Sequence, residues 1–200
     1  RLSSAASDVY KRQELVRDVI DSKGYKFLQP GPQPLYPFGF DQTNWSAGAN
    51  KITIQYSDFT TVIWKMDGDR YSRFIIDAYS SEKDAVAHNF ISQDGNYTDI
   101  LSTETIVVIQ GALYKDKATT LPSILTVGIG DLYIFNNGKY VQGTWRRTDI
   151  SESFEFFDVN QNPIEVPPSS QWIHVVPNEG QIVWSCLLYT SDAADDSRSG

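Results

Sequence analysis

The sequence is poor in the residues that build reactive or metal-binding centres. Among 200 residues there are one cysteine, Cys186, and two histidines, His88 and His174. A disulfide needs a second cysteine, and a cysteine-based zinc site needs several, so neither can form within the chain. Neither histidine has a second ligand at a useful spacing. We therefore expect no metal site, no cofactor and no thiolate chemistry.

Two further absences narrow the class of protein. No stretch approaches the roughly 18 consecutive apolar residues of a membrane span. Basic residues are scarce, since 17 Lys and Arg stand against 25 Asp and Glu and give a net charge of −8. Binding to a phosphate backbone needs clustered Lys and Arg. We therefore expect no nucleic-acid partner and no membrane span within this sequence.

The two ends of the chain are related at the level of DNA. Residues 3–13 (SSAASDVYKRQ) can be encoded by a DNA sequence whose reverse complement also encodes protein. Translated from its second base, that reverse complement gives residues 186–195 (CLLYTSDAAD). Selection on a protein does not produce such a relation, and the DNA resembles a sequencing-library adapter. We interpret residues 1–13 and 186–200 as translated adapter, which is excluded from fold reasoning. The middle, 14–185, has no cysteine and keeps the net charge of −8.

Residues 14–48 predict a short helix and a proline-rich segment. One helical stripe carries the apolar side chains Leu15, Val16, Val19 and Ile20. Gly24 suits the left-handed position that follows a helix end. In QPGPQPLYPFGF, four prolines remove backbone donors and fix φ, which favours extended chain. This region is predicted to be the end of an upstream domain with its linker; the alternative is an ordered arm packed on the main domain.

Residues 49–185 show the period of two that is typical of β-strands. In KITIQY, the side chains of Ile52, Ile54 and Tyr56 share one face. TIVVIQ is apolar enough for a strand buried on both faces. Other strand candidates are TVIWKM, RYSRFII, SILTVG, LYIF, KYVQGTWRR, FEFF, residues 164–166, WIHVV and IVW. The polar stretch 80–102 offers a short helix near 82–87.

Turn signals connect these segments. Asp67-Gly68-Asp69 and Asn136-Asn137-Gly138 both have the chemistry of a tight hairpin turn. The predicted fold is therefore mainly β: an antiparallel sandwich or open barrel of short hairpin-linked strands, preceded by the helix and the proline-rich linker.

Several of these segments, in this order, resemble a known family. They are ANKITIQYS, VIWKMDGDRYSRF, TIVVIQ, VGIGDLYIFNNGKYVQGTWRR, FEFFDVNQNPIEV and QWIHVVP. Together they are similar to the C-terminal domain of the YerB-like lipoproteins, a bacterial family of unknown function. The resemblance implies an extracytoplasmic, membrane-anchored lipoprotein with a separate N-terminal domain and a lipid anchor outside this sequence. It implies no catalytic residue, because none is established for the family.

The motifs that could carry chemistry each have a plainer structural interpretation. VGIGD lacks the third glycine and the following helix of a dinucleotide loop. In DVNQNPIEVPPS, Asp158, Asn160 and Asn162 occupy the first three ligand positions of a calcium loop, but Pro163 and Ser169 stand where glycine and glutamate are needed. A hairpin turn is favoured there. The segment 94–99 (DGNYTD) is a similarly weak calcium pattern.

Two arginines that alternate with aromatic residues are the best candidates for ligand contact. Tyr71 and Arg73 share one strand face, and so do Trp145 and Arg147. An arginine among aromatic rings can bind a carboxylate or stack on a ring. The structural alternative, packing or an internal ion pair, is favoured over a ligand role at all four positions.

The function predicted from these observations is a binding module of a bacterial cell-envelope lipoprotein, without catalytic activity of its own. Its partner would be another envelope protein or a cell-wall component. The alternative is an enzyme that acts on cell-wall material, with a site shared with the N-terminal domain. A cleft with two carboxylates about 5 to 10 Å apart would favour the enzyme, and an aromatic patch without perturbed acids would favour the binding module.

Overall fold

The computed structural model describes residues 15–24, 33–77, 81, 84–91, 97–117 and 120–186. It divides the chain into two units, Arg1–Gln33 and Pro34–Gly200. The predicted adapter segment 1–13 lies outside the described residues, as does the predicted C-terminal one except for Cys186. The calcium-like segment 94–99 lies mostly outside them as well.

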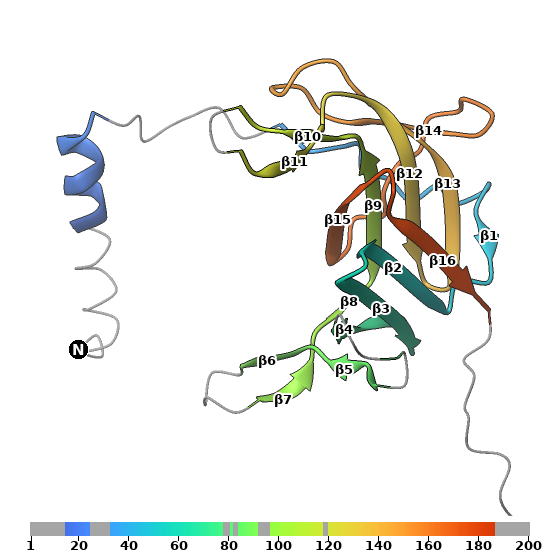
Figure 1. Cartoon of the computed structure of the whole chain (residues 1–200). Coiled ribbons are helices and arrows are strands. Elements are labelled where there is room, and N and C mark those ends of the chain that lie inside the picture. Colours follow the sequence, from blue (N-terminus) through green and yellow to red (C-terminus); the bar gives the residue numbers. More distant parts are fainter. Residues whose placement is uncertain are drawn as a thin grey trace, which may run out of the picture. The chain divides into compact units, whose positions relative to one another are not determined.

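The first unit contains the predicted helix, which spans residues 15–22 (Figure 1). Gly24 follows it with φ +69°, and its N–H donates to the carbonyl of Asp21, as expected for a left-handed residue after a helix end. Leu15, Val16 and Val19 each expose more than half of their surface. No helix among the described residues has the length and apolar character needed to cross a membrane.

The second unit is built on two six-stranded sheets and two small hairpins. The first sheet has the order β1-β13-β12-β9-β15, with β14 paired to β13. Its strands are β1 (Ser46–Ala47), β9 (Thr105–Gly111), β12 (Gly128–Asn136), β13 (Lys139–Arg147), β14 (Glu155–Asp158) and β15 (Gln171–Pro177). Every strand pair in it is antiparallel except β9 with β15, which run parallel.

The second sheet is antiparallel throughout and has the order β16-β2-β3-β4-β5, with β8 paired to β4. Its strands are β2 (Lys51–Ser57), β3 (Thr60–Asp67), β4 (Arg70–Asp77), β5 (Val86–Ala87), β8 (Ser102–Thr103) and β16 (Gln181–Ser185). The hairpins pair β6 (Asn89–Ile91) with β7 (Tyr97–Ile100), and β10 (Leu113–Lys115) with β11 (Pro122–Ile124).

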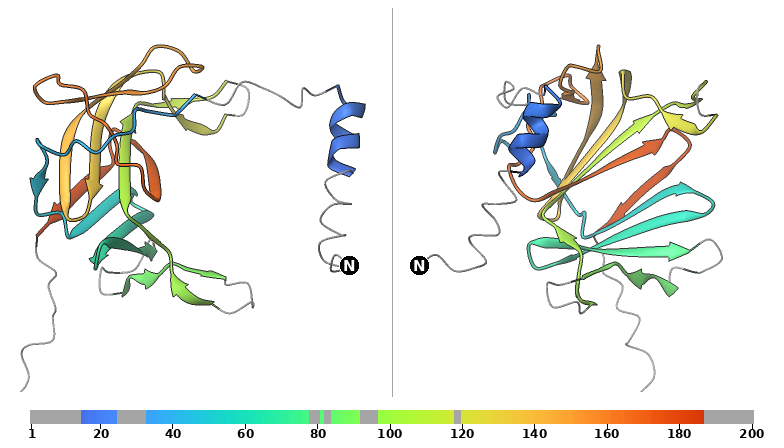
Figure 2. Two further views of the ribbon diagram at one scale, coloured as in Figure 1. Left: turned by 180° about the vertical axis from the view of Figure 1, so that it is seen from behind. Right: turned by 90° about the vertical axis from the view of Figure 1, so that its left-hand side faces the viewer.

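The two sheets face each other across a shared core, so the fold is a β-sandwich as predicted (Figure 2). Ile52 and Ile54 of β2 pack there with Ile106 and Val108 of β9, and all four side chains are fully buried. Alternate residues of β9, Val107 and Ile109, enter a second core on the outer face of the first sheet. The prediction that TIVVIQ is buried on both faces is therefore confirmed.

Both predicted hairpin turns are present. Asp67 pairs with Arg70 across a two-residue turn that contains Gly68 at φ +63°. In the other turn, Asn137 and Gly138 both have positive φ, 47° and 71°, which is the requirement of a type I′ turn.

The second core is covered by two segments without long strands. The arm that begins at Pro34 buries Tyr36, and the short strand β14 with the segments on either side of it contributes Phe154, Phe156 and Val166. Phe38 forms an isolated bridge with Val166. In this part, the proline-containing segment is an ordered arm on the β domain, one of the two options that the sequence allowed.

The structure differs from the strand predictions at three places. SILTVG splits, because β11 ends at Ile124 and β12 begins at Gly128. Residues 164–166 form no named strand, and within this range only Val166 makes an isolated bridge, with Phe38. The short helix predicted near 82–87 is wrong where the structure describes its end, because Val86–Ala87 is the strand β5 and pairs with β4.

Candidate functional site

The four candidate residues occupy two separate regions. Tyr71 and Arg73 lie on β4 in the second sheet, and Trp145 and Arg147 lie on β13 in the first. Tyr71 belongs to the core between the sheets, whereas Trp145 belongs to the core on the outer face of the first sheet. The fold therefore does not assemble the four residues into one site.

Tyr71 is fully buried and has both of its hydrogen-bonding functions satisfied. Its hydroxyl donates to the carbonyl oxygen of Ala49 (2.9 Å) and accepts from the N–H of Gly138 (3.0 Å). Burial raises the pKa of the phenol to about 12. These contacts hold the chain entering β2 against the β12–β13 turn, which is a structural role.

Trp145 and Arg147 are also fixed by the protein itself. Trp145 is buried, and its indole N–H donates to the carbonyl of Gln110 (2.7 Å). Arg147 Nε donates to the carbonyl of Glu152 (2.8 Å), and its Nη2 donates to that of Ile150. The guanidinium carbon lies 4.7 Å from the ring centroid of Phe154. Arg147 thus clamps the turn that follows β13.

Arg73 has a different environment, which we call the Arg73 cluster: Tyr56, Trp64, Arg73, His88, Trp172 and His174. Its guanidinium carbon lies 4.9 Å from the Trp172 ring centroid and 5.9 Å from that of Trp64. The two rings meet edge to face at 5.6 Å. Strands β2, β3 and β4 of one sheet and the edge strand β15 of the other supply these side chains, except for His88, which lies between β5 and β6. The cluster therefore lies on the side of the sandwich where β15 forms the edge of the first sheet.

His174 is the buried polar centre of the Arg73 cluster. The Trp64 indole N–H can only donate, so His174 Nε2, at 2.9 Å, accepts its hydrogen. Neutral His174 must then carry its proton on Nδ1, which donates to the Tyr56 hydroxyl oxygen. Burial, together with the charge of Arg73, lowers the pKa of His174 to about 3. The imidazole is therefore neutral throughout the physiological range.

His88 contacts the outer part of Arg73. Arg73 Nη1 can donate a hydrogen bond but cannot accept one, so it donates to His88 Nδ1. Partial burial and the charge of Arg73 lower the pKa of His88 below its usual 6.5. At neutral pH both histidines are uncharged, and Arg73 carries the charge of the cluster.

That charge is not neutralised within the described part of the chain. Neither a carboxylate nor a second hydrogen-bond acceptor contacts Arg73 there. Its Nε is buried without any hydrogen-bond partner, and burial lowers the pKa of the guanidinium. A buried donor that lacks an acceptor costs about 1–3 kcal/mol, and such groups in a native fold are uncommon.

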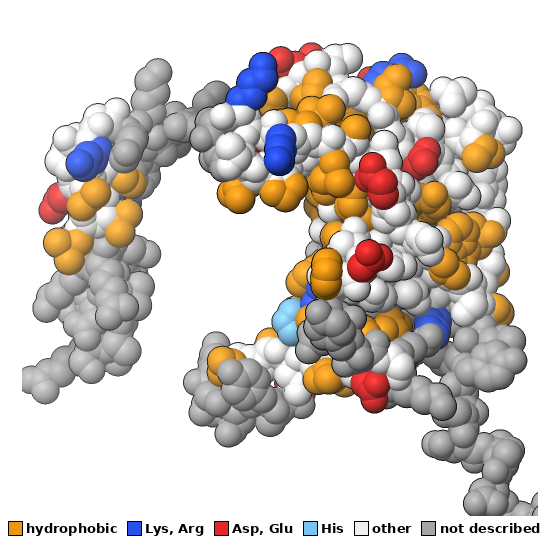
Figure 3. Space-filling view, in the orientation of Figure 1, with side chains coloured by type: hydrophobic (Ala, Val, Ile, Leu, Met, Phe, Trp, Pro, Cys, Tyr) orange, Lys and Arg blue, Asp and Glu red, His pale blue; other side chains and the backbone are white. Residues whose placement is uncertain are grey.

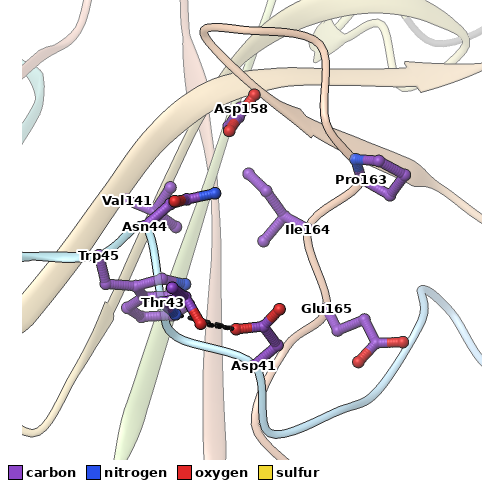
Figure 4. Close-up of a pocket in the computed structure, with 9 residues that line it drawn as sticks. All are labelled: Asp41, Thr43, Asn44, Trp45, Val141, Asp158, Pro163, Ile164 and Glu165. Carbon is purple, nitrogen blue, oxygen red and sulfur yellow. Dashed lines mark hydrogen bonds between the residues drawn. The ribbon is translucent and has the colours of Figure 1, made fainter.

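A second candidate is a cleft of about 330 Å³ beside Trp45, between the N-terminal arm and the loop after β14 (Figure 4). Figure 4 shows Asp41 and Glu165 on facing segments at one end and Asp158 at the other. Its lining comprises Asp41, Thr43, Asn44, Trp45, Val141, Asp158, Pro163, Ile164 and Glu165.

Two of the three acids of this cleft, Asp41 and Asp158, accept hydrogen bonds within local turns. Asp158 Oδ1 accepts from the backbone N–H groups of Asn160 and Asn162, both at 2.8 Å, and Asp41 accepts two hydrogen bonds from Thr43. These bonds lower the pKa of Asp158 and of Asp41. The predicted turn at 158–162 is confirmed, and the described residues contain no cluster of ligands suited to a metal ion.

An apolar surface lies on the β10–β11 hairpin. Leu113 and Tyr114 of β10 and the nearby Leu125 each expose more than 40% of their surface. Figure 3 shows hydrophobic side chains gathered over this part of the molecule (Figure 3). Patches of this kind occur at interaction surfaces.

The sequence singled out Arg73 but missed the residues around it. Trp172 and His174 alternate in WIHVV, which places them on one strand face and was the available signal. Their meeting with Trp64 and Arg73 depends on the pairing of β9 with β15, which no local pattern predicts. His88 lies in a polar stretch that carried no signal.

Comparison with known proteins identifies the family. Residues 51–173 match the family model described as "Protein of unknown function (DUF3048) C-terminal domain". The match covers more than half of the chain, which therefore belongs to this family. The fold is similar to the crystal structure of YerB from Bacillus subtilis, with a TM-score of 0.56 and 16% sequence identity.

The alignment with YerB covers 86% of this chain and 53% of YerB, so the chain spans about half the length of that protein. No curated protein matches the sequence. The predicted resemblance to YerB-like proteins is confirmed at the level of family and fold.

Proposed function

We propose that this domain is a binding module without catalytic activity of its own, carried by an extracytoplasmic lipoprotein of the bacterial envelope. Its partner is another envelope protein or a cell-wall component. The observation that carries the binding role is Arg73, a cation placed against Trp172 and Trp64 with no carboxylate partner among the described residues. The bacterial setting is supported by the similarity to YerB.

An arginine in this position is suited to recognition. The guanidinium stays protonated at any physiological pH and presents a fixed fork of donors. A partly buried charge without a counter-ion is unfavourable, so a ligand that brings a hydrogen-bond acceptor relieves a cost already present in the free protein. Strongly perturbed groups of this kind gather at functional sites.

The alternative is an enzyme acting on cell-wall material, with a site completed by an N-terminal domain. Glycoside hydrolysis needs a carboxyl group that remains protonated to act as general acid. Where the pKa of a described Asp is shifted, at Asp41, Asp84, Asp149 and Asp158, hydrogen bonds from neighbouring groups lower it. Such acids are held ionised, which favours binding over acid catalysis.

The test is to mix the purified chain with peptidoglycan sacculi and with a cross-linked extract of envelope proteins. Binding is followed by co-sedimentation, and catalysis by the release of soluble amines and reducing sugars. We expect retention on one of the two without release, and weaker retention of Arg73→Gln. Arg146→Gln is the matched control, because Arg146 also lies over a ring, Phe157 at 5.0 Å, but is exposed.

Release of soluble fragments by the wild-type chain would identify an enzyme and overturn the proposal. The compartment is tested separately by recovering the complete gene. A lipid-attachment cysteine after a signal peptide is the expected result.

A further inference from the structure

The Arg73 cluster contains more hydrogen-bond donors than acceptors. Arg73 offers five N–H groups and cannot accept. One of its nitrogens, Nη1, donates to His88, and Nε is buried without a partner. Four N–H groups therefore remain unused: Nε–H, both hydrogens of Nη2 and one of Nη1. The Nε–H and one Nη2–H lie on the edge along which an arginine binds a carboxylate side-on.

Tyr56 adds a further donor to the Arg73 cluster. Its hydroxyl oxygen receives the proton on His174 Nδ1, so its own hydrogen remains available. Burial raises the pKa of Tyr56 to about 12, while the nearby charge of Arg73 acts to lower it. The phenol is therefore protonated and close enough to Arg73 to feel its charge.

We infer that the Arg73 cluster binds a carboxylate group, held by the Nε–Nη2 edge of Arg73 and by the hydroxyl of Tyr56. This inference rests on the proposed binding function and adds the chemical class of the ligand. The carboxylate supplies acceptors to three of these donors: the Nε–H, one Nη2–H and the Tyr56 hydroxyl. Because Nε is buried, the side chains that cover it must move to admit the ligand. Trp172 and Trp64 lie against the guanidinium. A neutral amide of the same shape supplies one acceptor oxygen and places an unwanted donor against the site.

The charge of the cluster selects a monoanion. His174 and His88 are neutral at pH 7, so the cluster carries a single positive charge. One carboxylate neutralises this charge. A phosphate dianion would leave an excess negative charge at a partly buried position in a chain whose net charge is already −8.

The test is a titration of the ¹⁵N-labelled chain with benzoate and with its neutral isostere benzamide, followed by NMR. We expect benzoate to move the Arg73 Nε–H signal, which is assigned by its loss in Arg73→Lys, and the indole signal of Trp64. Benzamide should bind at least tenfold more weakly. Arg73→Lys retains the charge but removes the fork, and should weaken benzoate binding about tenfold or more.

Two further variants sharpen the result. Tyr56→Phe should weaken benzoate binding severalfold, and Arg146→Gln should leave it unchanged. The indole signal of Trp145, in the other core, shows whether each variant is folded. Equal binding of benzoate and benzamide, tighter binding of inorganic phosphate, or undiminished benzoate affinity in folded Arg73→Lys would each overturn the inference.

The source of the carboxylate is resolved by two ligands. A peptidoglycan stem peptide and an acidic protein peptide are each compared with their amidated forms. The one weakened by amidation identifies the source, and no effect of amidation on either overturns the inference.

This outcome is separable from that of the proposed function. If the chain is retained without releasing fragments but benzoate does not bind, the carboxylate inference fails and the binding function stands. If soluble fragments are released, the proposed function fails, and the benzoate titration still decides the chemistry of Arg73.

Discussion

Arg147 and Arg73 lie against aromatic rings at the edges of different cores, yet their donors are used differently. The guanidinium carbon is 4.7 Å from Phe154 in one case and 4.9 Å from Trp172 in the other. Arg147 donates to two backbone carbonyls in the turn after its own strand. Arg73 donates to one histidine and keeps a buried Nε unpaired. Ring stacking alone therefore does not distinguish a structural arginine from a binding one.

The electrostatic surroundings of the two arginines also differ, because Arg147 has a carboxylate nearby and Arg73 has only neutral groups among the described residues. Asp149 lies near Arg147, and its pKa is lowered mainly by hydrogen bonds from Ser151 and further by the Arg147 charge. The groups on which Arg73 acts are Tyr56, His88 and His174, all neutral at pH 7. An arginine balanced within its own loop is part of the framework, whereas one left unbalanced is available to a ligand.

The largest expected difference between the Arg73 cluster and the surroundings of Arg147 is in acid. There, protonation of His174 should lower the free energy of unfolding. Its pKa is about 3 in the fold and about 6.5 in the unfolded chain, so the unfolded chain takes up the proton first. Stability that is complete above pH 6.5 is lost as the pH falls towards 3, by about 1.4 kcal/mol per pH unit. We expect a loss of about 3 kcal/mol between pH 6.5 and 4, measured by urea unfolding.

The variant His174→Gln isolates this contribution, because glutamine retains hydrogen-bonding capacity but does not titrate. Its stability should change much less over the same pH interval, where carboxylates also begin to contribute. An equally steep loss in His174→Gln would show that the Arg73 region is not the origin of the acid sensitivity.

The next largest effect is that Arg147→Gln and Arg73→Gln should rank in opposite order for stability and for ligand binding. Arg147→Gln should lower the free energy of unfolding by about 1–2 kcal/mol, since it removes two hydrogen bonds and a ring contact. Arg73→Gln should cost less than about 0.5 kcal/mol, because the lost contacts are offset by removal of a buried, unpaired donor. Ligand binding should show the opposite order. A larger stability loss for Arg73→Gln would make Arg73 a structural residue as well.

Much of the fold follows from short-range patterns. The alternation in KITIQY, the apolar run TIVVIQ and the Asn137-Gly138 turn each depend on neighbours within a few residues, and each is present. The missed strands β1, β5, β6, β7, β8 and β10 have two to four residues and exist only because a longer strand or a hairpin partner lies beside them. Pairing of this kind leaves little trace in composition.

The candidate site was predictable only in part. Tyr-x-Arg in β4 and Trp-x-Arg in β13 are equivalent patterns in the sequence. Their difference comes from distant segments: a turn within five residues serves Arg147, while β15, about a hundred residues along the chain from Arg73, brings Trp172. The contacts that distinguish the structural Arg147 from the proposed binding residue Arg73 are tertiary. The sequence therefore identified both as candidates but could not show which of them has unused donors.

The smallest expected effect concerns the pH dependence of carboxylate binding. Arg73 is the charged group that the described structure shows acting on His88, and it helps hold the pKa of His88 below 6.5. When His88 takes up a proton, its Nδ1 becomes a donor and can no longer accept from Arg73 Nη1. The cluster then gains a second positive charge and frees a further donor.

Benzoate affinity should therefore rise about threefold or more as the pH falls from 7.5 to 5, where the ligand is still ionised. His88→Gln keeps an acceptor for Arg73 without a titrating group, and its benzoate affinity should be nearly independent of pH over this range. NMR titrations at several pH values measure both. A flat profile in the wild-type chain, or an equal rise in His88→Gln, would show that His88 does not compete with the ligand for Arg73. Arg73 would then differ from Arg147 only in having an unpaired Nε. The acceptors of Arg147 are backbone carbonyls, which do not titrate, so no such pH effect is expected there.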